Sequence, residues 1–232
     1  GRICCHSAAP WGFYGDGDPD YSSERVIRDV EDQLKILGTD YFDGMLIHDP
    51  PEIDPTLNKN GALSGLLELK SRGLVHYIGF GMNPHDFHLK AIETGDVDFL
   101  LCFNDYNLVR QTADKDIIPA ATAADIGILN GWSILRGLLT GIDINEAHKE
   151  WRTASSVPMK DADAAKKLRE WCLQENIDLL QLAIQFCLKE ERIHGNPIGS
   201  LNITQLESNV RAASTPLSDV EWRKFQTTFI NQ

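Results

Sequence analysis

The sequence predicts an α/β fold of the (β/α)8, TIM-barrel type. Short apolar runs alternate with longer segments of helical periodicity, the order expected of βαβ units around a parallel sheet. One run, Met45-Leu46-Ile47, is apolar throughout, as suits a strand covered on both faces. It ends at His48 shortly before Pro50, and α/β barrels carry their chemistry at the carboxyl ends of their strands.

The expected elements alternate along most of the chain. Strands are expected over residues 2–5, 44–48, 76–81, 97–103, 127–131 and 196–199. Helices are expected over residues 23–37, 62–72, 84–93, 116–125, 161–175, 179–189, 204–212 and 218–229. No linker rich in Pro, Gly or Ser divides them. We therefore expect one domain over residues 1–232, an α/β barrel.

Local signals support the first and the last helix. Ser22 or Ser23 can cap the first one, and Ser218 with Glu221 has the spacing of a capping box. The buried face of the first helix is predicted at Val26, Val30, Leu34 and Leu37. A doubly wound dinucleotide fold is the competing architecture, but the chain has no GxGxxG turn after an early strand.

The charge and apolar content exclude several classes of partner. The formal net charge is -12 and the Lys and Arg residues are scattered, which argues against nucleic acid. No apolar run reaches the roughly 18–20 residues of a membrane span, and the N-terminus lacks a signal-peptide pattern. We expect a small-molecule partner and a cytoplasmic protein. The sequence carries no signal for an oligomeric state.

The cysteines suggest core positions in a reducing compartment. The count of five is odd and contains no CxxC pair. Cys102 and Cys187 lie in apolar runs and are expected in the core. Cys4, Cys5 and His6 could be taken for metal ligands, but no second ligand pair matches them, so no metal is expected.

Several consecutive segments resemble the aldo-keto reductase superfamily. Leu37-Gly38-Thr39-Asp40-Tyr41-Phe42-Asp43 and Leu46-Ile47-His48 are similar to the approach to its fourth strand and to its strand-end histidine. Gly73-Leu74-Val75 followed by Gly81-Met82-Asn83 is similar to its fifth strand and turn. The His-Asp-Pro and Gly-Met-Asn sequences resemble the branch of aldose 1-dehydrogenases and L-galactose dehydrogenase-like enzymes.

The resemblance implies a barrel that binds NAD or NADP without a Rossmann unit. Hydride would pass between the nicotinamide and a carbonyl or hemiacetal carbon of a sugar or a small aldehyde or ketone. His48 would be the catalytic histidine that binds and polarises the substrate oxygen. Asn83 would bind the nicotinamide carboxamide, although as Asn83-Pro84 it could instead cap a helix. Trp132 would stack on the nicotinamide, or simply pack.

The rest of the cofactor site is implied by two further segments. Ser133-Ile134-Leu135-Arg136-Gly137-Leu138-Leu139 resembles the family's pyrophosphate loop, which makes Ser133, Leu135, Gly137 and Leu138 cofactor-binding residues. Near the C-terminus, the resemblance implies cofactor contacts at Gly199, Ser200, Gln205 and Asn209. No Lys or Arg stands where a 2′-phosphate would need one, at residues 201–204, which favours NAD or weak discrimination between NAD and NADP.

Three departures from the family pattern qualify this interpretation. Phe103 stands where many members carry a glutamine for the carboxamide, and Asn104 is a candidate replacement. Ser208 stands where many members carry an acidic residue. The family's catalytic tyrosine, aspartate and lysine have no match here and would precede Gly1, so the resemblance implies that the first two to three strands of the barrel are missing from this chain. We therefore expect an NAD(P)-dependent enzyme of which this chain alone is inactive.

Two other functions remain as alternatives. A non-catalytic scaffold of the same fold could retain nucleotide binding without the catalytic residues. A metal-dependent barrel hydrolase or lyase would need ligands at several successive strand ends, and only His48-Asp49 qualifies.

Overall fold

The structure, a computed structural model, describes residues 3–6, 20–146 and 157–230, and of residues 3–6 the backbone alone. Contacts within the chain divide it into two compact units. The first comprises residues 1–103 and 113–129, and the second comprises residues 104–112 and 130–232. The expectation of a single barrel domain stays a prediction, and each unit is described by itself.

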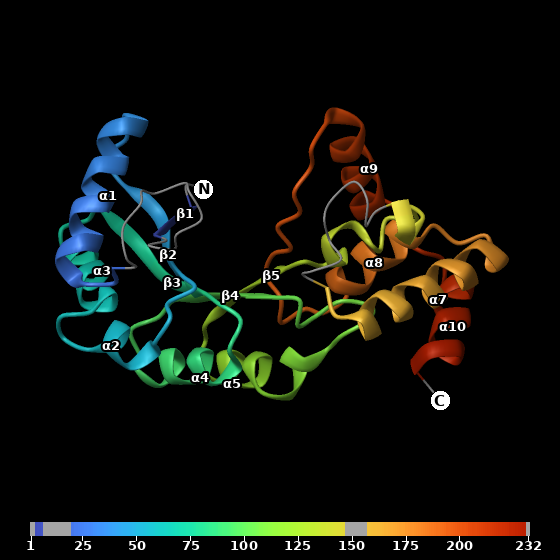
Figure 1. The fold of residues 1–232 in the computed structure, drawn as a ribbon, viewed down its shortest axis with the longest axis horizontal. Helices are drawn as coiled ribbons and strands as arrows, with labels where there is room; N and C mark the ends of the chain where they lie inside the picture. Colours follow the sequence, from blue (N-terminus) through green and yellow to red (C-terminus); the bar gives the residue numbers. More distant parts are fainter. Residues whose placement is uncertain (1–2, 7–19, 147–156, 231–232) are drawn as a thin grey trace. The chain divides into compact units, whose positions relative to one another are not determined.

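The first unit is built on a sheet of consecutive strands (Figure 1). Their order follows the chain: β1 (Ile3–His6), β2 (Phe42–His48), β3 (Val75–Gly81), β4 (Phe99–Phe103) and β5 (Gly127–Gly131). The last two residues of β5 belong to the second unit. The strands β1 to β4 pair in parallel. His48 lies opposite Gly81, so the ends of β2 and β3 reach the same edge. This is the sheet that βαβ alternation predicts.

Helices connect the strands of the first unit. They are α1 (Ser23–Leu37), α2 (Ile53–Leu57), α3 (Ala62–Ser71), α4 (His85–Glu93) and α5 (Ile117–Ala123). The helices α1 and α3 lie side by side, and α3 packs against β3 (Figure 1). Lys90 of α4 pairs with Asp54 of α2, with 2.7 Å between Nζ and Oδ1.

The strands of the first unit bury side chains on both faces. Met45 and Ile47 are fully buried on one face, and Leu46, on the other, is 1% exposed. Gly79 lies opposite Leu46 in β3 and is covered by the side chains of Leu46 and Phe99. The prediction that 45–47 is a strand covered on both faces is therefore confirmed.

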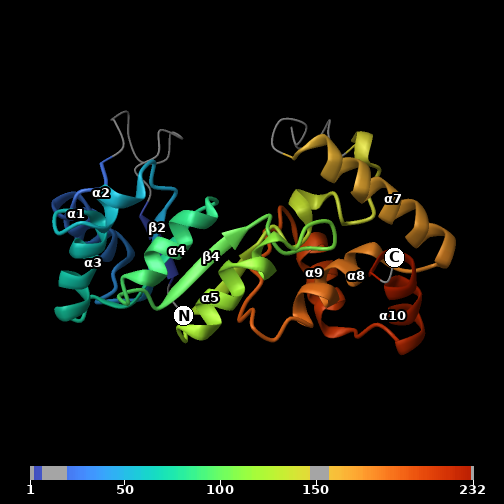
Figure 2. The same ribbon diagram turned by 90° about the horizontal axis from the view of Figure 1, so that it is seen from below.

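The second unit is mainly helical. After the short 3₁₀ turn η2 (Leu135–Gly137), it contains α7 (Met159–Glu175), α8 (Leu179–Leu188), α9 (Ile203–Ser214), α10 (Asp219–Phe225) and the π-helical turn η4 (Gln226–Ile230). The helices α8 and α9 pack together, as Figures 1 and 2 both show. The Gln185 amide of α8 donates to the Ala212 carbonyl of α9 at 2.8 Å. Apolar side chains of η2, α7, α8 and α10 share one core.

Many of the expected boundaries are confirmed. The first helix covers the predicted 23–37 and the fifth strand the predicted 127–131. Ser22 caps α1 by accepting from the Arg25 N–H, and Ser218 and Glu221 form the complete capping box of α10. These boundaries depend on side chains within a few residues of one another, so the sequence alone predicts them.

Three expectations about elements are wrong. Residues 196–199 form no strand. The backbone hydrogen bond next to them runs from the Asn130 N–H to the Gly195 carbonyl at 2.8 Å, and the Asn130 side-chain amide donates to Asn196 Oδ1 at 2.8 Å. Leu37 is 59% exposed, since α1 ends there and Gly38 turns the chain away with φ of 61°. The helix α2 follows Pro50-Pro51, in a region where no helix was expected.

The buried cysteines lie where the apolar runs placed them. Cys102 and Cys187 are fully buried, which confirms their predicted core positions. Burial raises the pKa of the Cys172 and Cys187 thiols to about 12. Within residues 20–146 and 157–230, no helix has the length and apolar content that a membrane crossing requires.

Candidate functional site

One group of predicted site residues lies in the first unit, at the carboxyl end of β2. The His48 side chain is 45% exposed, and its Nε2 is 3.5 Å from Asp49 Oδ2. Asp49 has φ of 46°, a left-handed conformation that is uncommon outside glycine and turns the chain sharply after the strand. His48 is thus an accessible imidazole at a strand end with a carboxylate beside it.

Tyr21 holds this strand end from a distant part of the sequence. Its hydroxyl donates to the His48 carbonyl at 2.5 Å and lies 3.1 Å from the Asp49 carbonyl. The sequence assigned Tyr21 no role, because it lies in no segment that resembles the family. Tyr21 and His48 are 27 positions apart, and a hydrogen bond at that separation cannot be predicted from a local sequence pattern.

Asn83 follows β3 at the same edge of the sheet. Its side-chain amide donates to the Phe103 carbonyl at 3.4 Å, which links the ends of β3 and β4. The helix-cap alternative is wrong, because Pro84 is the N-cap residue of α4 and no side chain caps the helix there. The Asn83 side chain is exposed, so it remains accessible to a ligand.

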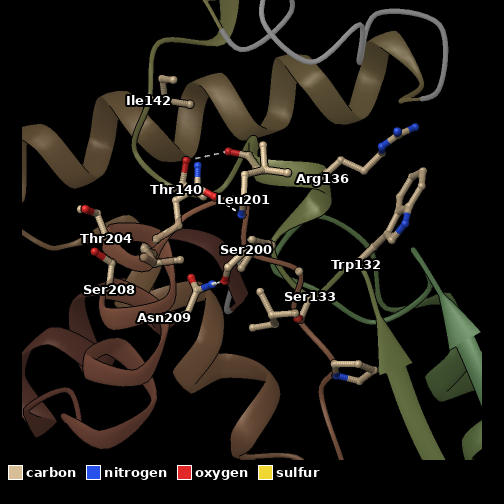
Figure 3. A pocket seen from close by; sticks show the side chains of 17 residues that line it. Trp132, Ser133, Arg136, Thr140, Ile142, Ser200, Leu201, Thr204, Ser208 and Asn209 are labelled. Carbon is tan, nitrogen blue, oxygen red and sulfur yellow. Dashed lines mark hydrogen bonds between the residues drawn. The ribbon is translucent and has the colours of Figure 1, made fainter. Parts of the chain in front are cut away.

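The second unit contains a cavity of about 780 Å³, a volume typical of small-molecule sites (Figure 3). Its wall comes from the segment after β5, from α8, from the segment that leads into α9, and from α9 itself. The lining includes the predicted residues Trp132, Ser133, Gly137, Gly199, Ser200, Gln205 and Asn209. Predicted residues more than 60 positions apart in the sequence therefore meet on one surface.

The segment after β5 has an unusual backbone. Trp132 has φ of 63°, Leu135 of 48° and Arg136 of 51°, three left-handed residues that are not glycine. Such conformations cost of the order of 1–3 kcal/mol each, and clusters of them occur at binding sites. The turn is closed by bonds from the Leu135 N–H to the Trp132 carbonyl at 2.7 Å and from the Gly137 N–H to the Ile134 carbonyl at 2.9 Å.

Leu135 and Leu138 do not present their side chains to the cavity. Both are fully buried and belong to the core of the second unit. They anchor the turn that carries the residues of the wall. A cofactor contact through their backbone stays a prediction.

Ser133 is the polar residue of the wall that most clearly fits a ligand. The residue is fully buried, and its Oγ has no hydrogen-bond partner among the described residues. A buried hydroxyl without a partner costs about 1–3 kcal/mol. A phosphate oxygen of a dinucleotide would satisfy it.

The wall formed by residues 199–209 combines an open backbone position with side chains that are fixed by hydrogen bonds. An added Cβ at Gly199 would meet no heavy atom within 4 Å, so a ligand can approach the backbone there. The Asn209 amide donates to Ser200 Oγ at 3.1 Å, and Gln205 Oε1 accepts from the Leu201 N–H at 2.8 Å. These residues offer hydroxyl and amide groups of the kind that can bind a dinucleotide.

Asn104 was the candidate replacement for the family's glutamine. It is nearly buried, has φ of 59°, and its Oδ1 accepts from the Asn107 amide at 3.4 Å. Its role toward the carboxamide stays a prediction. The segment of Cys4, Cys5 and His6 is described in its backbone only, and the described side chains include no group of three that could hold a metal.

Comparison with known proteins identifies the family. Residues 14–228 match the Aldo/keto reductase family. The chain belongs to this family. The superfamily that the His48 and Asn83 segments resembled is therefore confirmed.

Individual relatives agree with this assignment. L-galactose dehydrogenase of Arabidopsis thaliana is 27% identical over 212 residues, which are 89% of this chain and 63% of the relative. D-threo-aldose 1-dehydrogenase of a Pseudomonas species is 24% identical over 88% of this chain and 61% of the relative. The chain thus spans about three fifths of the length of these relatives.

A solved structure supports the fold. An aldo-keto reductase from Bacillus halodurans, in its holo form, superposes with a TM-score of 0.72 over 90% of this chain and 68% of that chain, at 22% identity. The predicted α/β fold of the TIM-barrel type is confirmed by this likeness and by the family.

Proposed function

We propose that this chain carries the cofactor site and the substrate-binding histidine of an NAD(P)-dependent oxidoreductase. The observation that carries the proposal is the cavity of the second unit, in which Ser133 presents a buried hydroxyl that has no partner among the described residues, beside Trp132. The reaction would transfer hydride between nicotinamide and a carbonyl or hemiacetal carbon of a sugar or small aldehyde or ketone. The names of two relatives, both sugar dehydrogenases, support the sugar class.

Each part of the cofactor would have its own residues. Trp132 would offer its ring to the nicotinamide, and Asn83 would bind the carboxamide. Ser133, Gly137 and Ser200 would receive the diphosphate. Gln205 and Asn209 would lie along the adenosine. The bound nicotinamide supplies or accepts the hydride, and the protein orients it and excludes water.

His48 would bind the reacting oxygen of the substrate. A neutral imidazole can donate a hydrogen bond to that oxygen and stabilise the charge that develops on it. The Asp49 carboxylate lies 3.5 Å from Nε2 at the same strand end. Tyr21 supports the arrangement by holding the carbonyls of both residues.

We infer that the cofactor is NAD, or that NAD and NADP are bound with weak discrimination. The part of the wall next to the adenosine contains Leu201, Thr204 and Ser208, none of them charged. A 2′-phosphate gains most from a guanidinium or ammonium group in direct contact. Arg211 donates to Ser208 Oγ at 3.3 Å but does not line the cavity, which fits weak rather than strict discrimination.

We further infer that this chain alone binds cofactor without turnover, because no residue matches the family's catalytic tyrosine, aspartate and lysine. A nucleotide-binding scaffold without catalysis is the second candidate, and the same absence is equally expected for it. We propose a single barrel domain and a cytoplasmic location. The buried free thiols of Cys102, Cys172 and Cys187 fit a reducing compartment.

The test is to titrate the full chain with NADH and NADPH by calorimetry and then to assay it with aldoses. We expect binding of both cofactors, with NADH equal or tighter, and no turnover. Absence of cofactor binding would overturn the proposal, and steady NADH formation from an aldose would overturn the inactivity of the chain. The scaffold is favoured instead if a longer chain with the upstream coding sequence also binds cofactor but turns over no aldose or aldehyde.

A further inference from the structure

Arg136 is the one Lys or Arg among the residues that line the cavity in the described part of the second unit. The protein as a whole carries a formal net charge of -12. An anionic ligand therefore depends on local positive charge at the point where it binds. Arg136 was not among the site residues that the family resemblance suggested.

Arg136 differs from its neighbours in the turn by its exposure to solvent. Leu135 and Leu138 are fully buried in the core, whereas Arg136 is exposed. Arg136 adopts φ of 51° and ψ of 33°, a left-handed conformation in which a residue with a side chain is uncommon. The core contacts of the leucines hold this conformation, so the guanidinium remains at the wall of the cavity.

The Arg136 guanidinium lies over the Trp132 ring, with 5.1 Å between its central carbon and the ring centroid. Figure 3 shows both side chains pointing to the same end of the cavity. Within residues 20–146 and 157–230, no carboxylate forms an ion pair with Arg136. A cation–π contact at an exposed site is worth only about 0.5–1 kcal/mol, so the guanidinium can exchange it for a stronger partner.

We propose that Arg136 is a further cofactor-binding residue that exchanges the Trp132 ring for the diphosphate of the bound dinucleotide. The inference rests on the proposed function of the cavity. Ser133, three positions earlier on the same turn, presents the buried hydroxyl that also needs an acceptor. Bonds between guanidinium and phosphate are charge-assisted and often bidentate, and they exceed an exposed cation–π contact.

The exchange couples the two ends of the cofactor site. While the guanidinium covers the Trp132 ring, that face is not available to a nicotinamide ring. When the guanidinium turns to the diphosphate, the same face is freed. Binding of the phosphates therefore prepares the surface on which the nicotinamide stacks, and Arg136 links the two events.

Binding to the full chain tests the proposal through ligands that contain different parts of the cofactor. NADH contains the diphosphate and the nicotinamide, ADP only the diphosphate, and adenosine neither. Arg136→Gln should weaken the binding of ADP and of NADH by about tenfold, which is the scale of one charge-assisted hydrogen bond. The affinity for adenosine, measured by competition, should stay within about twofold of the wild-type value. Arg136→Lys, which keeps the charge but loses the planar fork, should fall between.

Arg223→Gln is the matched control. Arg223 is exposed on α10 in the same unit and does not line the cavity. Its replacement by Gln changes the net charge by the same amount as Arg136→Gln does. It should leave all three affinities unchanged. Far-UV circular dichroism checks that each variant is folded.

Trp132 fluorescence, obtained as the difference between the wild type and Trp132→Phe, reports the exchange directly. ADP should change this component in the wild type and leave it unchanged in Arg136→Gln. The exchange would be overturned if Arg136→Gln bound ADP and NADH as tightly as the wild type does. It would also be overturned if ADP did not alter the Trp132 signal of the wild type. Either result would leave the proposed function intact. Failure of the wild type to bind NADH or ADP would overturn both.

Discussion

At the scale of single residues, the hydroxyl of Ser133 has the most unusual surroundings. It is buried on the wall of a cavity, and no described residue bonds to it. Removing this hydroxyl should therefore affect cofactor binding and protein stability in opposite directions. Ser133→Ala should raise the free energy of unfolding by about 1 kcal/mol and weaken NADH binding by about tenfold. Urea unfolding and calorimetry measure the two effects.

Ser200→Ala is the control for this prediction. The Ser200 hydroxyl already has a partner, because it accepts from the Asn209 amide at 3.1 Å. Its removal should cost stability as well as affinity. If Ser133→Ala destabilised the protein as Ser200→Ala does, the Ser133 hydroxyl would have a partner in the free protein, and the argument for a phosphate would lose its basis.

At the scale of elements, β3 is shaped by Gly79. A Cβ at this position would lie 2.7 Å from the Phe99 carbonyl oxygen and 2.8 Å from Leu46 Cδ2. Gly79→Ala should therefore destabilise the protein by about 2 kcal/mol through overpacking. Urea unfolding measures the cost.

Gly81→Ala provides the comparison in the same strand. Its Cβ would meet its nearest atoms, which include His48 Cδ2, at 3.8 Å, an ordinary contact. We expect a change in stability several times smaller than that of Gly79→Ala. Equal costs for the two variants would show that the close layer of Leu46 and Phe99 over Gly79 is not formed.

The start of α10 gives a prediction that depends on pH. Hydrogen bonds from Ser218 lower the pKa of Glu221 below its ordinary value of 4.5. The ionised carboxylate therefore stabilises the folded state above pH 4.5, and this contribution is lost as the pH falls through the lowered pKa. Ser218→Ala should cost about 1 kcal/mol at pH 7 and clearly less near pH 3.

Urea unfolding at the two pH values tests this prediction. Glu221→Gln is the control, because it keeps the size of the side chain and removes the titrating group. In that variant, the cost of Ser218→Ala should no longer depend on pH. A cost that is the same at pH 7 and pH 3 in the wild-type background would contradict the role of the Glu221 charge.

At the scale of the whole molecule, the cavity belongs to one unit. All of its lining residues lie in the second unit, between Trp132 and Asn209. NADH should therefore slow amide hydrogen exchange most strongly around residues 132–142 and 199–209. The amides of β2 and β3 should change less. Equal protection throughout both units would indicate that the ligand acts through global stability and not through this cavity.

Much of the architecture follows from the sequence by itself. Alternating apolar runs and amphipathic segments determine the parallel sheet and its helices, because strand burial and helix faces each impose a period on the chain. The helix α1 and the capping box of α10 were predicted with their boundaries. The end of β2 at His48 was also predicted, since two prolines follow it.

Only the tertiary structure decided the features that join distant segments. It showed that residues 196–199 form no strand, because a strand exists only with a partner that pairs along its length. It joined Tyr21 to the carbonyl of His48 and set Arg136 over Trp132. It also showed that no described residue bonds to the Ser133 hydroxyl. Local sequence patterns indicate whether a side chain is buried or exposed in its helix or strand. Which groups then meet depends on how the whole chain packs.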